Sequence, residues 1–323
     1  MMRTSYFGTL IGAFALLVAA NSDVSAQNVE VKDAPFFQDM VSSGKLPPLA
    51  NRLPTDPKII DVKSLGLESG QHGGTIRMAM RRSKDTRQMT VYGYARLVKY
   101  NKDLDIEVDI LKDIQIDDGR IFTLTLREGH RWSDGAPFSI EDFRYWWEDV
   151  ANNQDLFPSG PPSNLKIQGH YPIVTYPDAN KIRYEWPIPN PTFLPLLAQA
   201  SPRYIYAPAH YLKNYHADYQ DADKLDALVE ENGAKNWSAL HTKQAKAYHN
   251  QNPDLPVLQP WQLAEFATGE RYEFHRNPYF HRIDENGLQL PYVDKWIFNI
   301  TEKKLIPLKA ATGEIDLQAR YLG

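Results

Sequence analysis

The acidic side chains are the first candidates for catalysis, and their spacing argues against it. Glu141–Asp142 and Glu230–Glu231 are pairs of adjacent carboxylates. Neighbours on a helix point about 100° apart, so neither pair can flank one scissile bond. We interpret both pairs as solvated faces or helix caps.

The nine histidines are scattered through the chain, and their spacing matches no standard metal site. His275 and His281 lie six residues apart, as do His210 and His216. The chain has no Gly-x-Ser-x-Gly elbow, no His-Glu-x-x-His motif and no phosphate loop. Without cysteine it has no thiol nucleophile and no disulfide. We therefore predict no catalytic residue, no metal site, no cofactor and no enzyme activity.

Basic residues cluster in the polar segment after the first expected strand, at Arg81, Arg82, Lys84 and Arg87. Two interpretations stay open. The cluster is either an ordinary solvated loop or the border of a binding cleft, because ligands of open α/β sheets lie beyond the carboxyl ends of strands. The formal net charge is −4, and no basic stripe indicates nucleic-acid binding.

The elements around residues 121–143 are the most clearly patterned. Period-2 alternation over 121–126 predicts a half-buried strand. Asp134-Gly135 predicts a turn, and Ser139 with Asp142 forms a capping-box pattern at a helix start. The apolar side chains that follow are spaced for one helix face: Phe143, Trp146, Trp147 and Val150.

Similar patterns place the remaining elements. Strands are predicted over 75–80, 181–186, 270–275 and 295–300. Helices are predicted over 34–43, 191–201, around 225–229 and over 236–249, with Gly233 ending the third. Four prolines over 44–57 predict an extended arm, and residues 81–89 are expected to be a polar loop.

The N-terminus has the order of a secretory signal peptide. Arg3 precedes an apolar run of 13 residues from Gly8 to Ala20, which is shorter than the ~20 residues of a membrane span. Val24-Ser25-Ala26 offers small residues for cleavage, so residues 1–26 are predicted to be removed, leaving Gln27 first. With no cysteine to carry a lipid, a soluble periplasmic protein fits better than an anchored one.

Several motifs together resemble the family 5 extracellular solute-binding proteins. They are LREG at 126–129, W-x-DG-x-PF at 132–138, EDF at 141–143, RNPYF at 276–280 and GEID at 313–316. The Gly73-Gly74 strand start resembles that of the family as well. Leu258-Gln259-Pro260 departs from the usual Gly-Thr-Gly-Pro, which puts the turn geometry there in doubt. The resemblance covers residues 34–320.

The resemblance implies an α/β fold: one periplasmic binding protein type II-like lobe with an inserted α+β subdomain, and with the second lobe missing. The implied division is an N-terminal arm over 27–71, a discontinuous lobe over 72–95 and 194–320, and an insertion over 96–193. Complete family members are about twice this length. We therefore expect the N-terminal part of a receptor, with a natural one-lobe protein as the alternative.

The resemblance also implies the function. We expect a monomeric periplasmic receptor that captures peptides and delivers them to an ABC permease in the inner membrane. An oligosaccharide receptor, a secreted carbohydrate-active enzyme and a structural or adaptor protein are the alternatives. Transferred by position, the ligand contacts are Arg87, Gln88 and Met89 after the first strand and Phe157 in the insertion. One lobe by itself is expected to bind ligand weakly or not at all.

Overall fold

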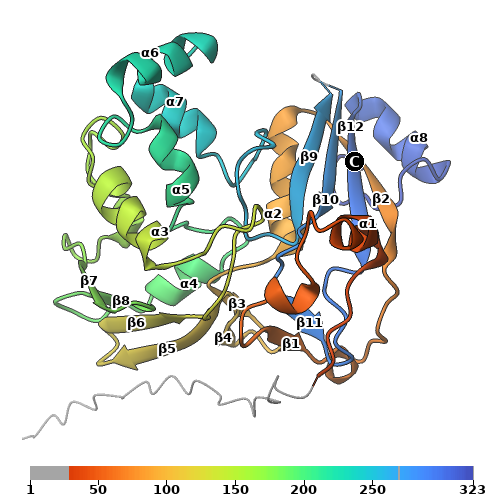
Figure 1. Cartoon of the computed structure of the whole chain (residues 1–323), viewed down its shortest axis with the longest axis horizontal. Helices are drawn as coiled ribbons and strands as arrows, with labels where there is room; N and C mark the ends of the chain where they lie inside the picture. The colour runs from red at the N-terminus through yellow and green to blue at the C-terminus, as the bar shows by residue number, and fades with distance from the viewer. Residues whose placement is uncertain (1–28, 268–269, 323) are drawn as a thin grey trace, which may run out of the picture.

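A computed structural model describes residues 29–267 and 270–322. The predicted signal peptide and its cleavage site lie outside these residues. Two halves, each built around a four-stranded sheet, lie side by side (Figure 1). Both halves combine helices and strands, as the predicted α/β class requires.

The first sheet is mixed and gathers strands from distant parts of the chain. Its order is β2 (Gly73–Met80), β12 (Val293–Ile300), β10 (Arg271–Arg276) and β9 (Trp261–Ala267). β2 runs parallel to β12, and the other pairs are antiparallel. The strands predicted over 75–80, 270–275 and 295–300 are thereby confirmed within a residue or two.

One face of this sheet is apolar because alternate side chains point to the same side. Met78, Phe274, Trp296 and Phe298 are buried there. Helix α2 (Arg87–Gly93) covers this face, and the Tyr92 ring stacks on Trp296 at 5.7 Å between centroids.

The second sheet is antiparallel throughout, in the order β5 (Leu111–Asp117), β6 (Ile121–Leu126), β8 (Lys181–Glu185) and β7 (Ile173–Asp178). The alternation predicted over 121–126 is confirmed, because Phe122, Leu124 and Leu126 are buried. They pack in one hydrophobic cluster with Trp186 and Phe193.

Helices cover this second sheet and extend beyond it. Their bounds are α3 (Ile140–Arg144), a π-helix η6 (Tyr145–Ala151), α4 (Phe193–Ala198), α5 (Ala209–Leu212), α6 (Ala222–Glu231) and α7 (Trp237–Gln244). The caps of α6 and α7 are side-chain oxygens: Asp221 accepts from Lys224 N at 3.2 Å, and Asn236 accepts from Ala239 N at 2.9 Å. This pair projects from the body of the molecule (Figure 1).

The remaining elements are short. They are η2 (Pro35–Phe37), α1 (Gln38–Ser42), η3 (Leu49–Asn51), β1 (Lys58–Ile60), η4 (Lys63–Leu65), η5 (Ser83–Thr86), β3 (Val98–Tyr100), β4 (Ile106–Val108), η7 (Ser163–Leu165), η8 (Lys213–Tyr215), β11 (Arg282–Asp284), η9 (Lys303–Leu305) and α8 (Ile306–Ala311). The arm lies on the first half, where β1 pairs in parallel with β11.

Three sequence expectations need correction. Residues 81–89 are no loop, because the Asp85 carboxylate accepts from the N–H groups of Arg81 and Arg82 and organises a turn that runs into α2. The arm over 44–57 is interrupted by η3. The helix expected over 236–249 ends at Gln244.

The predicted division into lobe and insertion stays a proposal. The strand at 75–80 pairs with β12, as the division requires.

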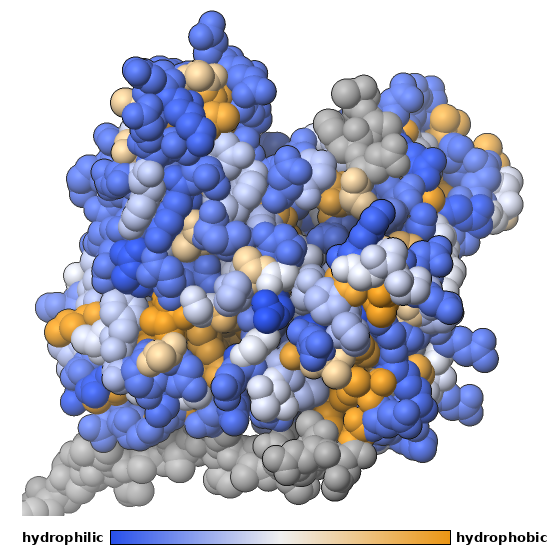
Figure 2. Space-filling view, in the orientation of Figure 1, coloured by the Kyte–Doolittle hydropathy of each residue, from blue (hydrophilic) through white to orange (hydrophobic). Residues whose placement is uncertain are grey.

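Figure 2 shows the surface of this view as mostly hydrophilic, with hydrophobic residues in separate patches.

Candidate functional site

A cavity of about 270 Å³ opens between the helices of the second half and the segment that leads into β9. Its lining is mostly aromatic and aliphatic, as expected of a site that binds an organic ligand. The lining residues are Trp132, Trp146, Val150, Leu156, Phe157, Tyr204, Tyr206, Ala207, Pro208, Leu212, His241, Thr242, Ala245, Lys246, Ala247, Leu255, Pro256, Val257, Leu258 and Gln259.

The π-helix η6 supplies one wall. Trp146 and Val150 line the cavity, whereas Tyr145 and Asp149 point to the helices on the other side. π-Helical segments are rare, and they occur often at functional sites. The helix therefore has an apolar face toward the cavity and a polar face away from it.

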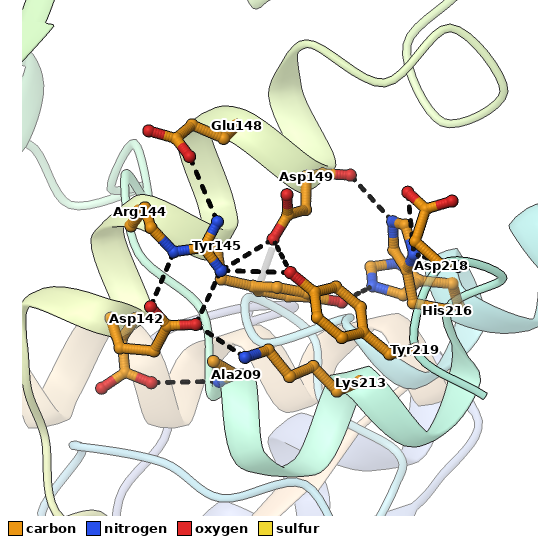
Figure 3. A network of polar contacts seen from close by, with 12 residues as sticks. Asp142, Arg144, Tyr145, Glu148, Asp149, Ala209, Lys213, His216, Asp218 and Tyr219 are labelled. Carbon is orange, nitrogen blue, oxygen red and sulfur yellow. Dashed lines mark hydrogen bonds and ion pairs between the residues drawn. The ribbon is translucent and has the colours of Figure 1, made fainter.

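The polar face of η6 joins a dense network (Figure 3). Arg144 Nη2 donates to Glu141 at 2.7 Å and to Asp149 at 3.0 Å, and Nη1 donates to Glu148 at 3.2 Å. These hydrogen bonds raise the pKa of Arg144. The network thus holds the polar face of η6 in place, while the apolar face of η6 lines the cavity.

His241, from α7, connects the network to the cavity. Its Nε2 lies 2.7 Å from the Tyr145 hydroxyl, and burial lowers its pKa to about 3. His241 is therefore neutral at physiological pH. Burial also raises the pKa of Tyr145, so the hydroxyl stays protonated and forms a hydrogen bond with the neutral ring.

Trp132 is positioned by a carboxylate that joins three segments. Asp142 accepts from Trp132 Nε1 at 3.1 Å, from Ser139 N at 2.9 Å and from Ala209 N at 3.0 Å. The Ser139 bond confirms the role predicted for Asp142 at the start of α3. Burial raises the pKa of Asp142 to about 6, against the opposing effect of these donors.

Helix α2 of the other half is hydrogen-bonded to the segment after α7, which lines the cavity with Ala245, Lys246 and Ala247. The Thr90 hydroxyl donates to Tyr248 O at 3.2 Å, just beyond α7. Gln259 Nε2 donates to Ala95 O at 3.0 Å, and within the described part of the chain its buried Oε1 has no hydrogen-bond partner. The segment where the sequence departs from the family pattern is thus part of the cavity wall.

The four predicted ligand contacts lie in different environments. Phe157 lines the cavity and is half-buried. Arg87 begins α2, and its side chain is 27% exposed and pairs with Asp85 at 3.7 Å. Gln88 and Met89 are 3% and 4% exposed, and Met89 belongs to the core of the first sheet.

Sequence reasoning missed most of the cavity. The sequence pattern places Trp132 in a turn and Trp146 on a helix face, and it does not indicate that both line a cavity. The alternation of Tyr204 and Tyr206 was a usable signal for a strand-like segment with one aromatic side. Nothing in the sequence pointed to His241, whose partner Tyr145 is 96 residues away.

Two further features are absent from the described residues. Within residues 29–267 and 270–322, no three His, Asp or Glu residues are grouped to hold a metal ion. In the same part of the chain, no helix has the length and apolar character needed to cross a membrane.

Comparisons with known proteins agree on one family. Residues 109–322 match the bacterial extracellular solute-binding proteins, family 5 Middle. The periplasmic alpha-galactoside-binding protein of Rhizobium meliloti (strain 1021) is 24% identical over 308 residues, which are 87% of this chain and 40% of that protein.

Solved structures give the same result. An oligopeptide-binding protein OppA superposes with a TM-score of 0.81 at 30% identity, over 91% of this chain and 45% of that one. The periplasmic binding protein MelB of Agrobacterium fabrum C58, in complex with stachyose, has the same fold, with a TM-score of 0.70 at 21% identity over 89% of this chain and 43% of that one. The chain thus spans less than half the length of these relatives.

Proposed function

This chain belongs to the bacterial extracellular solute-binding proteins, family 5, and we propose that it captures peptides in the periplasm for an ABC importer. The type II periplasmic binding fold predicted from the sequence is confirmed by the OppA superposition. The relatives named above are binding proteins, not enzymes, by their names.

The aromatic cavity is the observation that carries the proposal. Aromatic and aliphatic walls bind the apolar parts of a ligand, and a few polar groups orient it. Within the described residues, no aspartate or glutamate lines this cavity. Glycoside hydrolysis needs two carboxylates across the bond, so the cavity is suited to binding.

The proposed contacts have distinct roles. Phe157 would pack against an apolar group of the ligand, and Arg87 would bind a ligand carboxylate through its planar guanidinium. Gln88 and Met89 are buried, and they would hold the helix that carries Arg87.

The proposed mechanism needs a second wall. In this family two lobes close around ligand by a hinge motion before delivery to the permease. We propose that this chain supplies one wall of that cleft, acts as a monomer and is exported by its cleaved signal peptide.

An oligosaccharide is the second candidate ligand. It is favoured by the similarity, over 87% of this chain, to a protein named for binding alpha-galactosides. Flat aromatic rings such as Trp132 and Trp146 also suit the apolar face of a sugar.

Calorimetry on the protein purified from the periplasm of its host tests the proposal. We expect a peptide mixture to give saturable heat and stachyose to give none. Arg87→Ala should weaken peptide binding by roughly 1.5–3 kcal/mol, because a charged hydrogen bond is lost. Binding of stachyose without binding of peptide would show that the ligand is an oligosaccharide and not a peptide. Binding of neither, by a protein whose circular dichroism is native, would overturn the proposal.

A further inference from the structure

The segment after α8 runs along the outer edge of the first sheet. The edge strand there is β2, whose other side pairs with β12. Arg77 N donates to Asp316 Oδ2 at 2.7 Å, and Arg77 O accepts from Asp316 N at 2.9 Å. Two residues further along β2, Ala79 N donates to the Gln318 side chain at 3.0 Å, and Ala79 O accepts from it at 3.1 Å. Residues 313–321, which we call the edge strap, thus take the place of a neighbouring strand.

The edge strap is held by hydrogen bonds more than by burial. The Arg77 side chain adds bonds from Nε to Asp316 at 2.9 Å and from Nη2 to Gly313 O at 3.0 Å. Every residue of the strap is exposed or half-buried. Segments with few buried apolar contacts open at a low cost in free energy. The strap can therefore detach while the sheet stays folded.

Tyr321 ends the edge strap in a strained conformation. Its φ is 65°, a left-handed value that is unfavourable for residues other than glycine. The hydroxyl of this residue donates to Asp85 Oδ2 at 2.9 Å, which helps to keep the backbone in this conformation. The end of the strap is thus tied to a side chain that lies beyond β2.

Asp85 is the carboxylate that organises the turn η5 at the start of α2. Its side chain is fully buried, and the same Oδ2 accepts from Arg81 N at 3.2 Å and from Arg82 N at 3.3 Å. Within the described residues, Oδ1 has no hydrogen-bond partner. A buried carboxylate is unfavourable when it has few donors, so loss of the Tyr321 bond should loosen this turn.

Helix α2 connects the turn to the wall of the aromatic cavity. Gly93 ends the helix and packs so closely against Pro260 that a Cβ atom at this glycine would lie 2.8 Å from Pro260 Cδ. One turn earlier, the Thr90 hydroxyl donates to Tyr248 O at 3.2 Å. Both partners are next in the chain to residues that line the cavity.

We propose that the edge strap, residues 313–321, is releasable and controls the order of α2 and, through α2, of the cavity wall. While the strap is seated, the edge of β2 is paired and Asp85 has its third donor. When the strap is released, the backbone groups at the edge of β2 are unpaired and α2 loses support at its start. The device lies outside the cavity and operates whichever ligand the cavity binds.

Hydrogen exchange followed by mass spectrometry on the purified protein tests the strap. The decisive variant is Gln318→Ala, because the bonds that it removes lie at Ala79 and not at Asp85. We expect amides of the strap and of residues 81–90 to exchange roughly 3- to 10-fold faster, because release of the strap removes the Tyr321 bond as well.

A second variant acts at the other end of the strap. Tyr321→Phe removes only the hydroxyl and should accelerate exchange over 81–90 to a similar extent. Gln318→Ala/Tyr321→Phe should exchange less than roughly 2-fold faster than either single variant, because both substitutions release the same strap. A smaller increase is expected over 245–250, where α2 contacts the cavity wall.

Matched controls lie on the second half of the molecule. Gln115→Ala removes an exposed amide that donates to Asp117, and Tyr219→Phe removes a hydroxyl that donates to Asp149. Both controls should leave exchange over 81–90 unchanged.

Three results would contradict the proposal. Unchanged exchange over 81–90 in Gln318→Ala would overturn it, because Asp85 would then be held independently of the strap. Equal acceleration within β6 would indicate a loss of global stability and would also overturn a local strap. Acceleration over 81–90 with none over 245–250 would contradict the link to the cavity wall.

Discussion

Arg96 shows how a single buried side chain holds several backbone segments together. Its guanidinium is 1% exposed and donates to Ala95 O at 2.8 Å, Thr90 O at 2.9 Å, Ala200 O at 2.8 Å and Gln199 O at 3.1 Å. These carbonyls belong to the end of α2 and to the segment after α4. Burial lowers the pKa of Arg96, but arginine stays charged at any physiological pH.

Arg96→Met should lower the free energy of unfolding by about 3 kcal/mol or more, because four carbonyls lose their donor inside the protein. Urea denaturation followed by circular dichroism measures this change. Lys102→Met, at an exposed lysine that pairs with its neighbour Asp103, should change stability by no more than about 0.5 kcal/mol. Equal effects of the two substitutions would contradict the role given to Arg96.

Two buried histidines make stability depend on pH. The rings of His130 and His281 lie 4.9 Å apart between centroids, and His281 Nε2 lies 3.1 Å from Asp109. Burial lowers the pKa of His130 well below its usual value and that of His281 to about 4. Arg127 and Arg282 face the same cluster and further disfavour imidazolium.

The sign of the effect follows from proton uptake. Below pH ~6.5 the unfolded chain protonates His281 and the folded protein does not, so stability falls as pH decreases toward about 4. Asp142 acts in the opposite direction, because its folded pKa is raised to about 6. Comparison with a variant at one histidine separates the two contributions.

His281→Asn retains an N–H donor for Asp109 and removes the titration. We expect the stability advantage of the natural protein over this variant to be largest above pH 7. It should shrink by up to about 1.4 kcal/mol per pH unit below pH 6. Denaturation curves at pH 7.5, 6, 5 and 4.5 measure the difference, and a difference independent of pH would refute the assignment.

At the scale of elements, helix α3 is fixed by its third residue. Asp142 receives hydrogen bonds from the start of its own helix, from the Trp132 indole and from the start of α5. Two of these segments line the cavity, with Trp132 and with Leu212 of α5. The capping pattern at the start of one helix therefore also aligns elements 67 residues apart.

Asp142→Ala should cost about 3 kcal/mol or more, because three buried or half-buried N–H donors are left without an acceptor. Asp226→Ala, on the exposed side of α6, is the matched control and should change stability by less than about 0.5 kcal/mol. The Trp132 signal in near-ultraviolet circular dichroism should change only in the first variant. An unchanged midpoint for Asp142→Ala would show that water replaces the carboxylate.

At the scale of the whole molecule, Asp109 joins the two halves. It is fully buried just before β5, and it accepts from Arg282 Nε at 2.8 Å and from Arg282 Nη2 at 2.5 Å. Arg282 begins β11, on the first half. The charge of Arg282 and the bond from His281 hold the pKa of Asp109 well below its usual value, although burial raises it.

Removal of one partner of Asp109 should weaken the connection between the two halves. Arg282→Met should destabilise the protein by about 3–5 kcal/mol, because the Asp109 carboxylate stays buried with fewer partners. Hydrogen exchange followed by mass spectrometry should show faster exchange at 96–111 and 281–284 before 121–126.

The matched control for Arg282→Met is a substitution in a surface ion pair. Arg120 and Glu185 are about one-third exposed on the second sheet, so Arg120→Met should cost no more than about 1 kcal/mol. If Arg282→Met were equally mild, or if exchange rose first within β6, the two halves would not be joined through Asp109.

Local patterns in the sequence determined much of the fold. The strands at 121–126 and 181–186 were readable because side chains alternate between more and less buried positions, and neighbouring residues carry that signal. Asp142 was readable as a helix cap for the same reason. The family was readable from motifs that lie within single turns and strands.

Contacts between distant residues were decided only by the tertiary structure. The segment 81–89 contains no helix signal as clear as its basic charges, yet Asp85 and the sheet beneath Met89 make it helical. The cavity is formed by residues from Trp132 to Gln259, which only chain folding brings together. Such contacts depend on long-range packing, which no periodicity within a short window can encode.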